Sequence, residues 1–276
     1  MKKSLDIPRS RELLAASLVS LAMVALILAV QFLSEVDSSD STPIVEHQPI
    51  AVFPDFASIN NVEVKKQQFF DFLQDYIVAE NSSITSIREE LRPYIAIANS
   101  GVAFSARERM WVLNLAEDYR IESAVMDDRE IVNELMLRVD VIPLSLALAQ
   151  AANESAWGTS RFTLEGNNIF GQWCYEEGCG IVPARRRSGA THEVESFESV
   201  ESSVQAYILN INTHPSYEYL RQLRAEMRQQ ERQLDPMELA YGLGDYSERG
   251  DSYVDEVQNI IIQNDLRSRS RKLIQR

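Results

Sequence analysis

The sequence predicts a mainly α-helical domain with a small β lobe, preceded by one transmembrane helix. Apolar residues recur at helical spacing over most of the chain after residue 57, and residues 166–197 lose that spacing while gaining Gly, Pro, Cys and Arg. Residues 13–33 form one long apolar run. The chain has 276 residues, 45% of them hydrophobic, which is enough to bury the core of one domain.

The first predicted element is the transmembrane helix. Residues 13–33, LLAASLVSLAMVALILAVQFL, have only Ser and Gln as polar interruptions and are about long enough to span a bilayer. Four basic residues precede the run, namely Lys2, Lys3, Arg9 and Arg11. By the positive-inside rule we expect residues 1–12 to be a cytoplasmic tail and the rest of the chain to be exported.

A cleavable signal peptide and a buried core helix are the alternatives for this run. Its length and the lack of a clean cleavage site after it favour an uncleaved anchor. We therefore expect a single-pass protein of the inner (cytoplasmic) membrane. The lipid bilayer is then a partner of the N-terminal helix, and the C-terminal domain lies in the periplasm or outside the cell.

A linker and a first set of helices are expected next. Residues 34–56 mix acidic, Ser and Pro residues without helical spacing, which indicates a linker, and the domain is expected over residues 57–276. A helix is expected from Val62, and Asn81, Ser82 and Ser83 are expected to end it. Further amphipathic helices are expected over residues 84–98, 105–119 and 128–138.

The following helix is different in kind. It begins with Pro143, is apolar almost all round through Ala152, and ends by presenting Glu154. This composition predicts the buried centre of the domain. Trp157 is expected to lie on the same side of a helical turn, and burial beside an aromatic group raises the pKa of a Glu enough to make a general acid. A solvated Glu154 and a core Trp157 are the alternatives.

The remaining chain predicts the β lobe and the closing helices. Residues 166–197 are expected to form an irregular β-hairpin lobe. The only two cysteines, Cys174 and Cys179, lie in it and are expected to form a disulfide, since a zinc site would need two more ligands nearby. Helices are expected over residues 198–223, from Pro236 to Gly242 and Gly244, and over residues 252–266.

Charge and histidine content argue against several kinds of function. The formal net charge of −14 is unsuited to binding the phosphates of nucleic acid. The three histidines, His47, His192 and His214, lack the short spacing of a helix-borne or hairpin-borne metal site. We therefore expect no nucleic-acid partner, no catalytic metal and no cofactor.

Two adjoining motifs resemble a known family. AQAANESAWGTSRF, followed at once by EGNNIFGQW, resembles the start of the bacterial endo-β-N-acetylglucosaminidase domain of flagellar-rod peptidoglycan hydrolases and autolysins. The resemblance covers roughly residues 142–261, and the likeness to membrane-anchored members of the family extends over most of the chain. It implies a lysozyme-like fold and a peptidoglycan hydrolase that cleaves the β-1,4 bond after N-acetylglucosamine. Glu154 would be its catalytic acid and glycan strands its partner.

The same resemblance implies further site residues. Asn167, Asn168, Phe170 and Gly171 would shape the groove where the β lobe starts. The segment GLGDYSERGDSYVDEV is similar to the family's GYATDPxYxxxI segment. On that match Tyr246 is a catalytic-site tyrosine, with an ordinary loop aromatic as the alternative.

The second carboxylate of the family has no clear counterpart here. We expect Glu193 in this role from its spacing, with Glu195, Glu176 and Glu177 as alternatives. Trp173 is expected to bind substrate by stacking on a sugar face, as Tyr175 could, although packing beside the disulfide is equally compatible. The basic run Arg185, Arg186 and Arg187 is either a solvated loop or a contact for carboxylates of the wall polymer.

Two other functions stay open from the sequence. A lytic transglycosylase or muramidase would also place a Glu at the end of a buried helix, but the GLMQ-type segment expected of transglycosylases is absent. A chain without a working second carboxylate could instead be a membrane-anchored adaptor that binds the wall without cleaving it.

Overall fold

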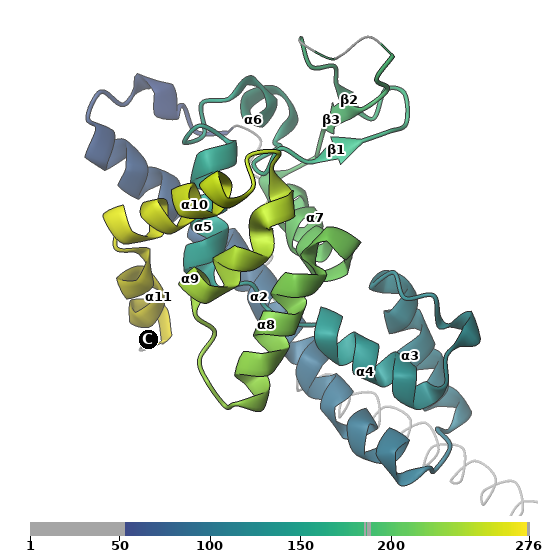
Figure 1. Ribbon diagram of the computed structural model, residues 1–276. Coiled ribbons are helices and arrows are strands. Elements are labelled where there is room, and N and C mark those ends of the chain that lie inside the picture. Colours follow the sequence, from purple (N-terminus) through teal and green to yellow (C-terminus); the bar gives the residue numbers. More distant parts are fainter. Residues whose placement is uncertain (1–52, 185, 187–188, 275–276) are drawn as a thin grey trace, which may run out of the picture. The chain divides into compact units, whose positions relative to one another are not determined.

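The computed structural model describes residues 53–184, 186 and 189–274 (Figure 1). The predicted cytoplasmic tail, the membrane helix over residues 13–33 and most of the predicted linker lie outside the described residues. Within the described ranges, none of the helices has both the length and the apolar character that crossing a membrane requires. The described part is mainly helical with one small antiparallel sheet, which confirms the mainly α prediction.

The elements of the described chain are labelled in Figure 1. The α-helices are α2 (Val62–Ser100), α3 (Ala106–Asp118), α4 (Asp128–Arg138), α5 (Leu144–Glu154), α6 (Arg161–Gly166), α7 (Val200–Thr213), α8 (Glu218–Gln229), α9 (Pro236–Leu239), α10 (Asp251–Gln263) and α11 (Leu266–Ile274). The strands are β1 (Trp173–Cys174), β2 (Gly180–Ile181) and β3 (Glu193–Glu195), and the 3-10 helices are η1 (Phe56–Ser58), η2 (Ser123–Val125), η3 (Pro215–Tyr217) and η4 (Ala240–Tyr246).

Helix α5 lies at the centre of the domain, as its apolar composition predicts. Every residue from Leu144 to Ala152 is buried. α5 contacts α2, α9, α10 and α11, which surround it in Figure 1. Burying all sides of one helix in this way holds its C-terminal residue, Glu154, at a fixed place in the domain.

Helix α2 corrects the sequence-based expectation of two helices. It runs without a break through Asn81, Ser82 and Ser83. The side chain of Asn81 donates to the carbonyl of Ile142 (2.8 Å) and accepts from its N–H (3.1 Å), so its amide groups serve a tertiary contact and do not compete with the helix. The Ser82 hydroxyl donates to the carbonyl of Val78 one turn earlier. These polar residues, which were predicted to end the helix, are therefore compatible with a continuous helix.

Two other boundaries differ from expectation. Phe53 and Phe56 fall in the predicted linker, yet Phe56 is 2% exposed and both rings pack edge-on against Phe72 of α2. At the other end, α11 follows the last helix that the sequence indicates, and Leu266 at its start is fully buried. In both places a few apolar side chains in a polar segment join the core, a contact that local composition does not indicate.

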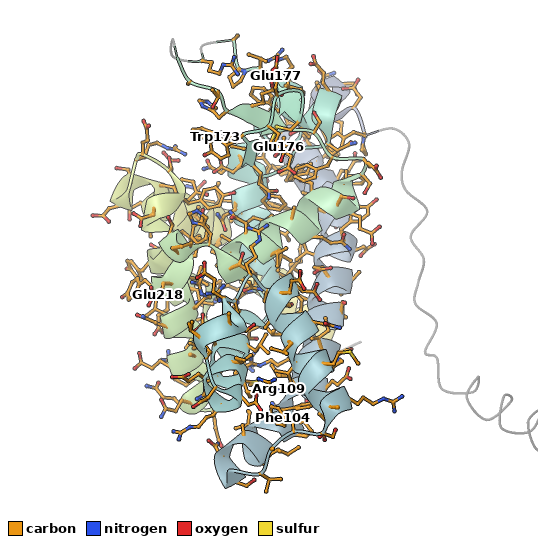
Figure 2. All side chains as sticks on the ribbon, turned by 90° about the vertical axis from the view of Figure 1, so that its right-hand side faces the viewer. Phe104, Arg109, Trp173, Glu176, Glu177 and Glu218 are labelled. Carbon is orange, nitrogen blue, oxygen red and sulfur yellow. A yellow bond between two sulfur atoms is a disulfide. The ribbon has the colours of Figure 1, made fainter. Side chains whose placement is uncertain are left out.

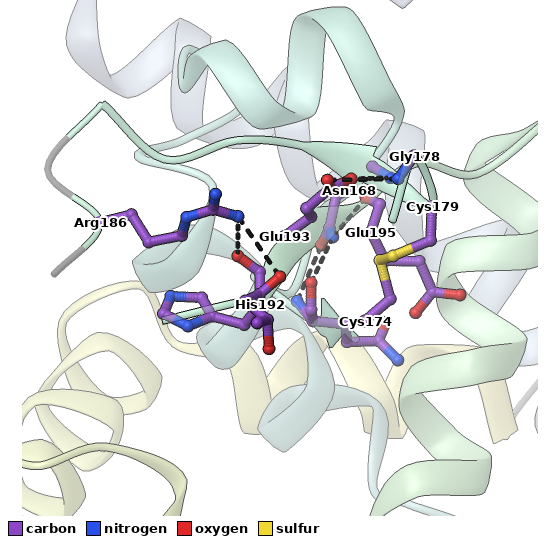
Figure 3. Close-up of a disulfide and its surroundings, with 11 residues drawn as sticks. Asn168, Cys174, Gly178, Cys179, Arg186, His192, Glu193 and Glu195 are labelled. Atoms are coloured by element: carbon purple, nitrogen blue, oxygen red, sulfur yellow. Dashed lines mark hydrogen bonds between the residues drawn. A yellow bond between two sulfur atoms is a disulfide. The ribbon is translucent and has the colours of Figure 1, made fainter. Parts of the chain in front are cut away.

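The β lobe is a three-stranded antiparallel sheet with strand order β1-β3-β2. β3 lies between its partners, with Val194 opposite Trp173 on one side and Ile181 on the other. The predicted disulfide between Cys174 and Cys179 is present and closes the loop between β1 and β2 (Figure 3). The lobe lies between the central helix and α7, as the sequence predicts, and the short helix α6, which was not predicted, precedes it.

A buried charge cluster joins four segments at the N-terminal side of α5. Asp140 is 2% exposed and lies within 4.0 Å of the guanidinium groups of Arg88, Arg224 and Arg228. Arg224 is 1% exposed and also donates to the carbonyls of Leu137 and Asp140. Because these bonds connect α2 and α8 to the segment between α4 and α5, they hold the start of the central helix in place.

Candidate active site

Glu154 is the last residue of α5, and the chain turns sharply after it. The Ser155 hydroxyl donates to the carbonyl of Ala151 (2.6 Å) and accepts from the N–H of Gly158 (2.8 Å), which caps the end of the helix. Ala156, Trp157 and Gly158 then all have positive φ. At Gly158 a Cβ would lie 2.6 Å from the ring of Phe56, so only glycine fits. The sequence therefore ends the buried helix directly at the carboxylate.

The Glu154 carboxylate interacts with two polar side chains. Asn153 donates to its Oε1 (3.2 Å), and the hydroxyl of Tyr253, on α10, lies close enough to lower the pKa of the carboxyl group. Gly171 lies beside the carboxylate, since a Cβ there would be 3.8 Å from Oε2 of Glu154. The end of α5, the start of α10 and the entry to the β lobe thus meet at this carboxylate.

A directed chain of hydrogen bonds leads to Glu154. The Tyr207 hydroxyl donates to Oε1 of Gln150 (2.5 Å), and Nε2 of Gln150 donates to the Tyr253 hydroxyl (3.0 Å). Because the Tyr253 oxygen accepts the Gln150 proton, its own proton is directed to Glu154. Gln150 and Tyr253 are fully buried, so this network fixes the carboxylate in one orientation.

The pKa of Glu154 is raised above its ordinary value of 4.5. Burial is the largest cause, because the charged form loses hydration. The hydrogen bonds from Tyr253 and Asn153 lower the pKa and offset part of this effect, and the positive charge of Arg249 acts in the same direction. A carboxyl group with a raised pKa keeps its proton at a higher pH, as a general acid must.

Tyr246 lies in the same neighbourhood but has a different contact. Its hydroxyl donates to the carbonyl of Phe170 (2.8 Å), and its ring stacks on Tyr253 at 5.3 Å between centroids. Burial raises the pKa of Tyr246. The tyrosine of this motif that interacts with the Glu154 carboxylate is Tyr253, seven residues further along, and the role expected for Tyr246 stays a prediction.

Three of the four residues expected to shape the groove connect the β lobe to the rest of the domain. Asn168 is 1% exposed, and its Nδ2 donates to the carbonyls of Gln172 (2.9 Å) and Glu195 (2.8 Å). Asn167 donates to the carbonyl of Phe197 (3.0 Å), and the buried ring of Phe170 stacks on Tyr207 at 3.8 Å. These contacts fasten the lobe to the helical domain beside Glu154.

Trp157 lies beyond the end of α5 and not on its last turn. Its ring packs edge-on against Phe69 and Phe70 of α2, with centroid distances of 6.0 and 5.4 Å, and the Lys66 ammonium lies 5.3 Å from its centroid. The helical spacing that we used to place Trp157 over Glu154 is therefore wrong. Its role in substrate binding stays a prediction.

Trp173 is the exposed aromatic of the β lobe. Its side chain is 55% exposed and stacks on His192 at 4.2 Å between ring centroids. Tyr175, in the disulfide loop, is 70% exposed. Figure 2 shows Trp173 near Glu176 and Glu177 on the lobe, far from Phe104 and Arg109 at the opposite end. An exposed flat ring supported by a second ring is a suitable surface for a sugar face.

The two candidate second carboxylates on β3 differ in their contacts (Figure 3). The Glu193 carboxylate is 5% exposed and accepts from the N–H groups of Gly178 (3.2 Å) and Gly180 (2.9 Å), which braces the disulfide loop. The Glu195 carboxylate makes no hydrogen bond or ion pair with the described residues. Burial raises the pKa of Glu195, and the positive charge of Arg120 offsets part of that effect.

Arg186 and the described histidines all have partners. Arg186, the described member of the basic run, donates to the carbonyls of Thr191 (3.3 Å) and His192 (3.2 Å) and so closes the loop before β3. His214 accepts from the N–H of Ser216 (3.2 Å). Across the described part of the chain, His, Cys, Asp and Glu side chains form no group of three that could hold a metal ion.

Comparisons with known proteins show which family this chain resembles. Residues 129–266 match the family model described as mannosyl-glycoprotein endo-beta-N-acetylglucosaminidase. Protein bax of Escherichia coli (strain K12) is 32% identical over 200 residues, which cover 72% of this chain and 70% of that protein. The catalytic domain of the autolysin Auto from Listeria monocytogenes aligns with a TM-score of 0.40 and 15% identity, covering 76% of this chain and 90% of that one. The matched family segment contains Glu154, Glu195 and Tyr253.

Proposed function

Because the chain belongs to the glucosaminidase family, we propose that it hydrolyses the β-1,4 bond after N-acetylglucosamine in peptidoglycan, with Glu154 as the general acid. The observation that carries this proposal is the place of Glu154. It ends a helix that is buried from Leu144 to Ala152, accepts a hydrogen bond from Asn153, interacts with Tyr253, and has a raised pKa. A glycosidic oxygen is a poor leaving group, so a proton donor of this kind is the first requirement of the reaction.

In the proposed reaction the Glu154 proton moves to the bridging oxygen as the bond from that oxygen to C1 breaks. The bonding electron pair stays with the leaving oxygen, which becomes the hydroxyl of the departing sugar. Water then supplies the oxygen of the new reducing end at C1 and loses a proton to a carboxylate. Tyr253 acts as a positioning residue, because its hydrogen bond fixes the orientation of Glu154.

For the second carboxylate we propose Glu195. Glu193 is the residue expected from spacing, but its carboxylate accepts hydrogen bonds from two backbone N–H groups. If the Glu193 carboxylate turned toward a substrate, these N–H donors would lose their acceptor. Glu195 lies two residues further along β3, and its carboxylate accepts no hydrogen bond from the described residues. A raised pKa also suits a group that handles a proton.

Substrate contact is proposed for the exposed face of the β lobe. Trp173, supported by His192, offers a flat apolar surface of the type on which sugar rings stack. The sequence further supports a place in the cell envelope, because residues 13–33 have the composition of a membrane anchor and four basic residues precede them. An anchored hydrolase with its domain on the outer side would reach the glycan strands.

Analysis of the new reducing ends tests this function. Purified protein is incubated with peptidoglycan sacculi, the products are reduced with borohydride, and the reduced sugars are identified. The proposal expects reduced N-acetylglucosamine. Reduced N-acetylmuramic acid would show a muramidase and anhydromuramic ends a lytic transglycosylase, while binding without any new ends would show an adaptor. Each of these three results contradicts the proposal.

A further inference from the structure

A cavity of about 770 Å³ lies at the other end of the central helix from Glu154. It is lined by Ser145, in the first turn of α5, nine residues before Glu154. At a rise of about 1.5 Å per residue the two positions are about 14 Å apart, so the cavity is separate from the candidate active site. Its apolar lining comes from four segments and includes Val78, Val141, Ile142, Leu144, Leu234 and Pro236.

The polar groups of this cavity favour an anion. Arg228 and Arg267 line it, and its described lining contains no acidic residue. Behind Arg228, Asp140 is shared by three arginines, which leaves an excess of two positive charges in that cluster. Such a concentration of positive charge is unusual in a chain whose formal net charge is −14.

The start of α5 adds hydrogen-bond donors on the same side. No side chain caps this helix, whose cap position is Pro143, so its first N–H groups have no side-chain acceptor. The free N-terminus of an eleven-residue helix attracts negative charge through its dipole. On the lining arginines, Nε and Nη2 of Arg228 bond Asp140, and Nη2 of Arg267 bonds Asp235. The remaining guanidinium donors are available.

Ser145 supplies the observation that points to a ligand. The residue is 2% exposed and lines the cavity, yet its hydroxyl makes no hydrogen bond to any described residue. Among the described residues the buried side-chain atom without a hydrogen-bond partner is Oε1 of Gln172, so the Ser145 hydroxyl is accessible and opens onto the cavity. An acceptor placed in the cavity would satisfy it.

We propose that this cavity binds a small amphipathic carboxylate. The carboxylate would accept from the Ser145 hydroxyl, the start of α5 and the free guanidinium donors, while an unbranched or compact apolar body would lie on the aliphatic lining. A neutral amphiphile would gain no charge-assisted bond from the arginines, and a cationic one would meet like charge. The inference does not depend on the proposed hydrolysis.

Calorimetric titration of the purified protein with decanoate tests this site, with decanol and decyltrimethylammonium as probes of the same apolar length. Saturable binding of decanoate at one site is expected, at least about tenfold tighter than decanol, the loss expected for one charge-assisted bond. Decyltrimethylammonium is expected not to bind. Equal binding of decanoate and decanol, or no saturable binding of decanoate, would overturn the proposal.

Variants locate the binding. Thr85 is an exposed residue of α2 that lines the cavity, whereas Ser83 is exposed on the same helix and does not line it. T85W is expected to weaken decanoate binding at least about tenfold by filling the cavity, and S83W is expected to leave it unchanged. S145A is expected to weaken binding without lowering the melting temperature. A lower melting temperature with unchanged binding would show that the hydroxyl serves the fold and would contradict the proposal.

Discussion

The hydroxyl of Tyr253 interacts with the carboxylate of Glu154 and lowers its pKa, although the two residues lie on different helices about a hundred positions apart in the chain. Burial raises the pKa of Glu154, and this interaction offsets part of the increase. Burial keeps the Glu154 carboxyl group protonated at a higher pH than usual, and the interaction with Tyr253 fixes the orientation of the side chain. The account of the site depends on this pairing.

Removing the Tyr253 hydroxyl is expected to change the pH dependence of the reaction. The interaction with this hydroxyl favours the ionised form of Glu154, so Y253F is expected to raise the pKa of Glu154. Activity that needs protonated Glu154 is lost as pH rises through this pKa. The basic limb of the pH profile of kcat/KM should therefore move upward, by about one unit if the bond contributes about 1.5 kcal/mol.

The matched control is Y246F. The Tyr246 hydroxyl donates to the carbonyl of Phe170 and not to Glu154, so its removal should leave the basic limb where it is. The assignment of Tyr253 as the positioning residue would be contradicted if the basic limb of the kcat/KM profile shifted in Y246F but not in Y253F.

The raised pKa of Glu154 also predicts a stability effect. A group whose folded pKa is higher than its unfolded pKa binds more protons in the folded state, so the free energy of unfolding falls as pH rises between the two values. E154Q does not titrate there. The variant should unfold at a higher temperature than wild type at pH 7, and the difference should shrink as pH falls toward 4.5. A difference that grows on acidification would show that the pKa is lowered.

Separate substitutions on β3 distinguish the two candidate carboxylates. E195Q is expected to lower kcat by about 10²-fold or more with little change in melting temperature, because its carboxylate has no partner among the described residues. E193Q is expected to lower stability by about 1.5–3 kcal/mol, since a charged acceptor of two N–H groups is lost. Thermal unfolding and steady-state kinetics measure both. A large loss of kcat in folded E193Q alone would restore Glu193 as the second carboxylate.

The Asp140 cluster predicts a large loss of stability. Burial raises the pKa of Asp140, but Arg224, Arg228 and Arg88 together outweigh burial and hold that pKa below its ordinary value of 3.8. D140N leaves three arginines without their shared counter-charge and should cost about 3–5 kcal/mol in urea unfolding. The stability that Asp140 contributes is present above pH 3.8 and is lost as pH falls through its lowered folded pKa.

The exposed ion pair between Glu238 and Arg232 provides the control for this measurement. E238Q should cost less than about 1 kcal/mol, because water screens both partners. Equal losses in D140N and E238Q would show that the buried cluster contributes no more than a surface pair.

Sequence reasoning placed the elements whose signals are local. Helices α3 and α4 begin at Ser105 and Asp127, each of which forms a capping box with a Glu three residues later, and α5 is recognisable from its continuous apolar run. The end of that run gives the position of Glu154, whereas its role as the acid is implied by the resemblance to the family. The disulfide was also predictable, because the two cysteines have no other partner in the sequence.

The features that sequence reasoning missed depend on tertiary contacts. Asn81 was predicted to end a helix. Its side chain instead bonds the backbone of Ile142, 61 residues away, and does not compete with the helix, so α2 continues. Spacing favours Glu193 over Glu195, and the sequence does not show that the Glu193 carboxylate accepts from the N–H groups of Gly178 and Gly180. Tyr253 and Tyr246 occur in one motif, and the packing of α10 against α5 decides which of them reaches Glu154.

The most direct measurement is the release of reducing ends from peptidoglycan sacculi by the wild type, E154Q and E165Q. Glu165 is an exposed carboxylate on α6 and serves as the control for loss of a nearby charge. The account predicts that the wild type and E165Q digest the sacculi at similar rates, while folded E154Q releases almost nothing. Digestion by folded E154Q at the wild-type rate would contradict the central claim that Glu154 donates the proton.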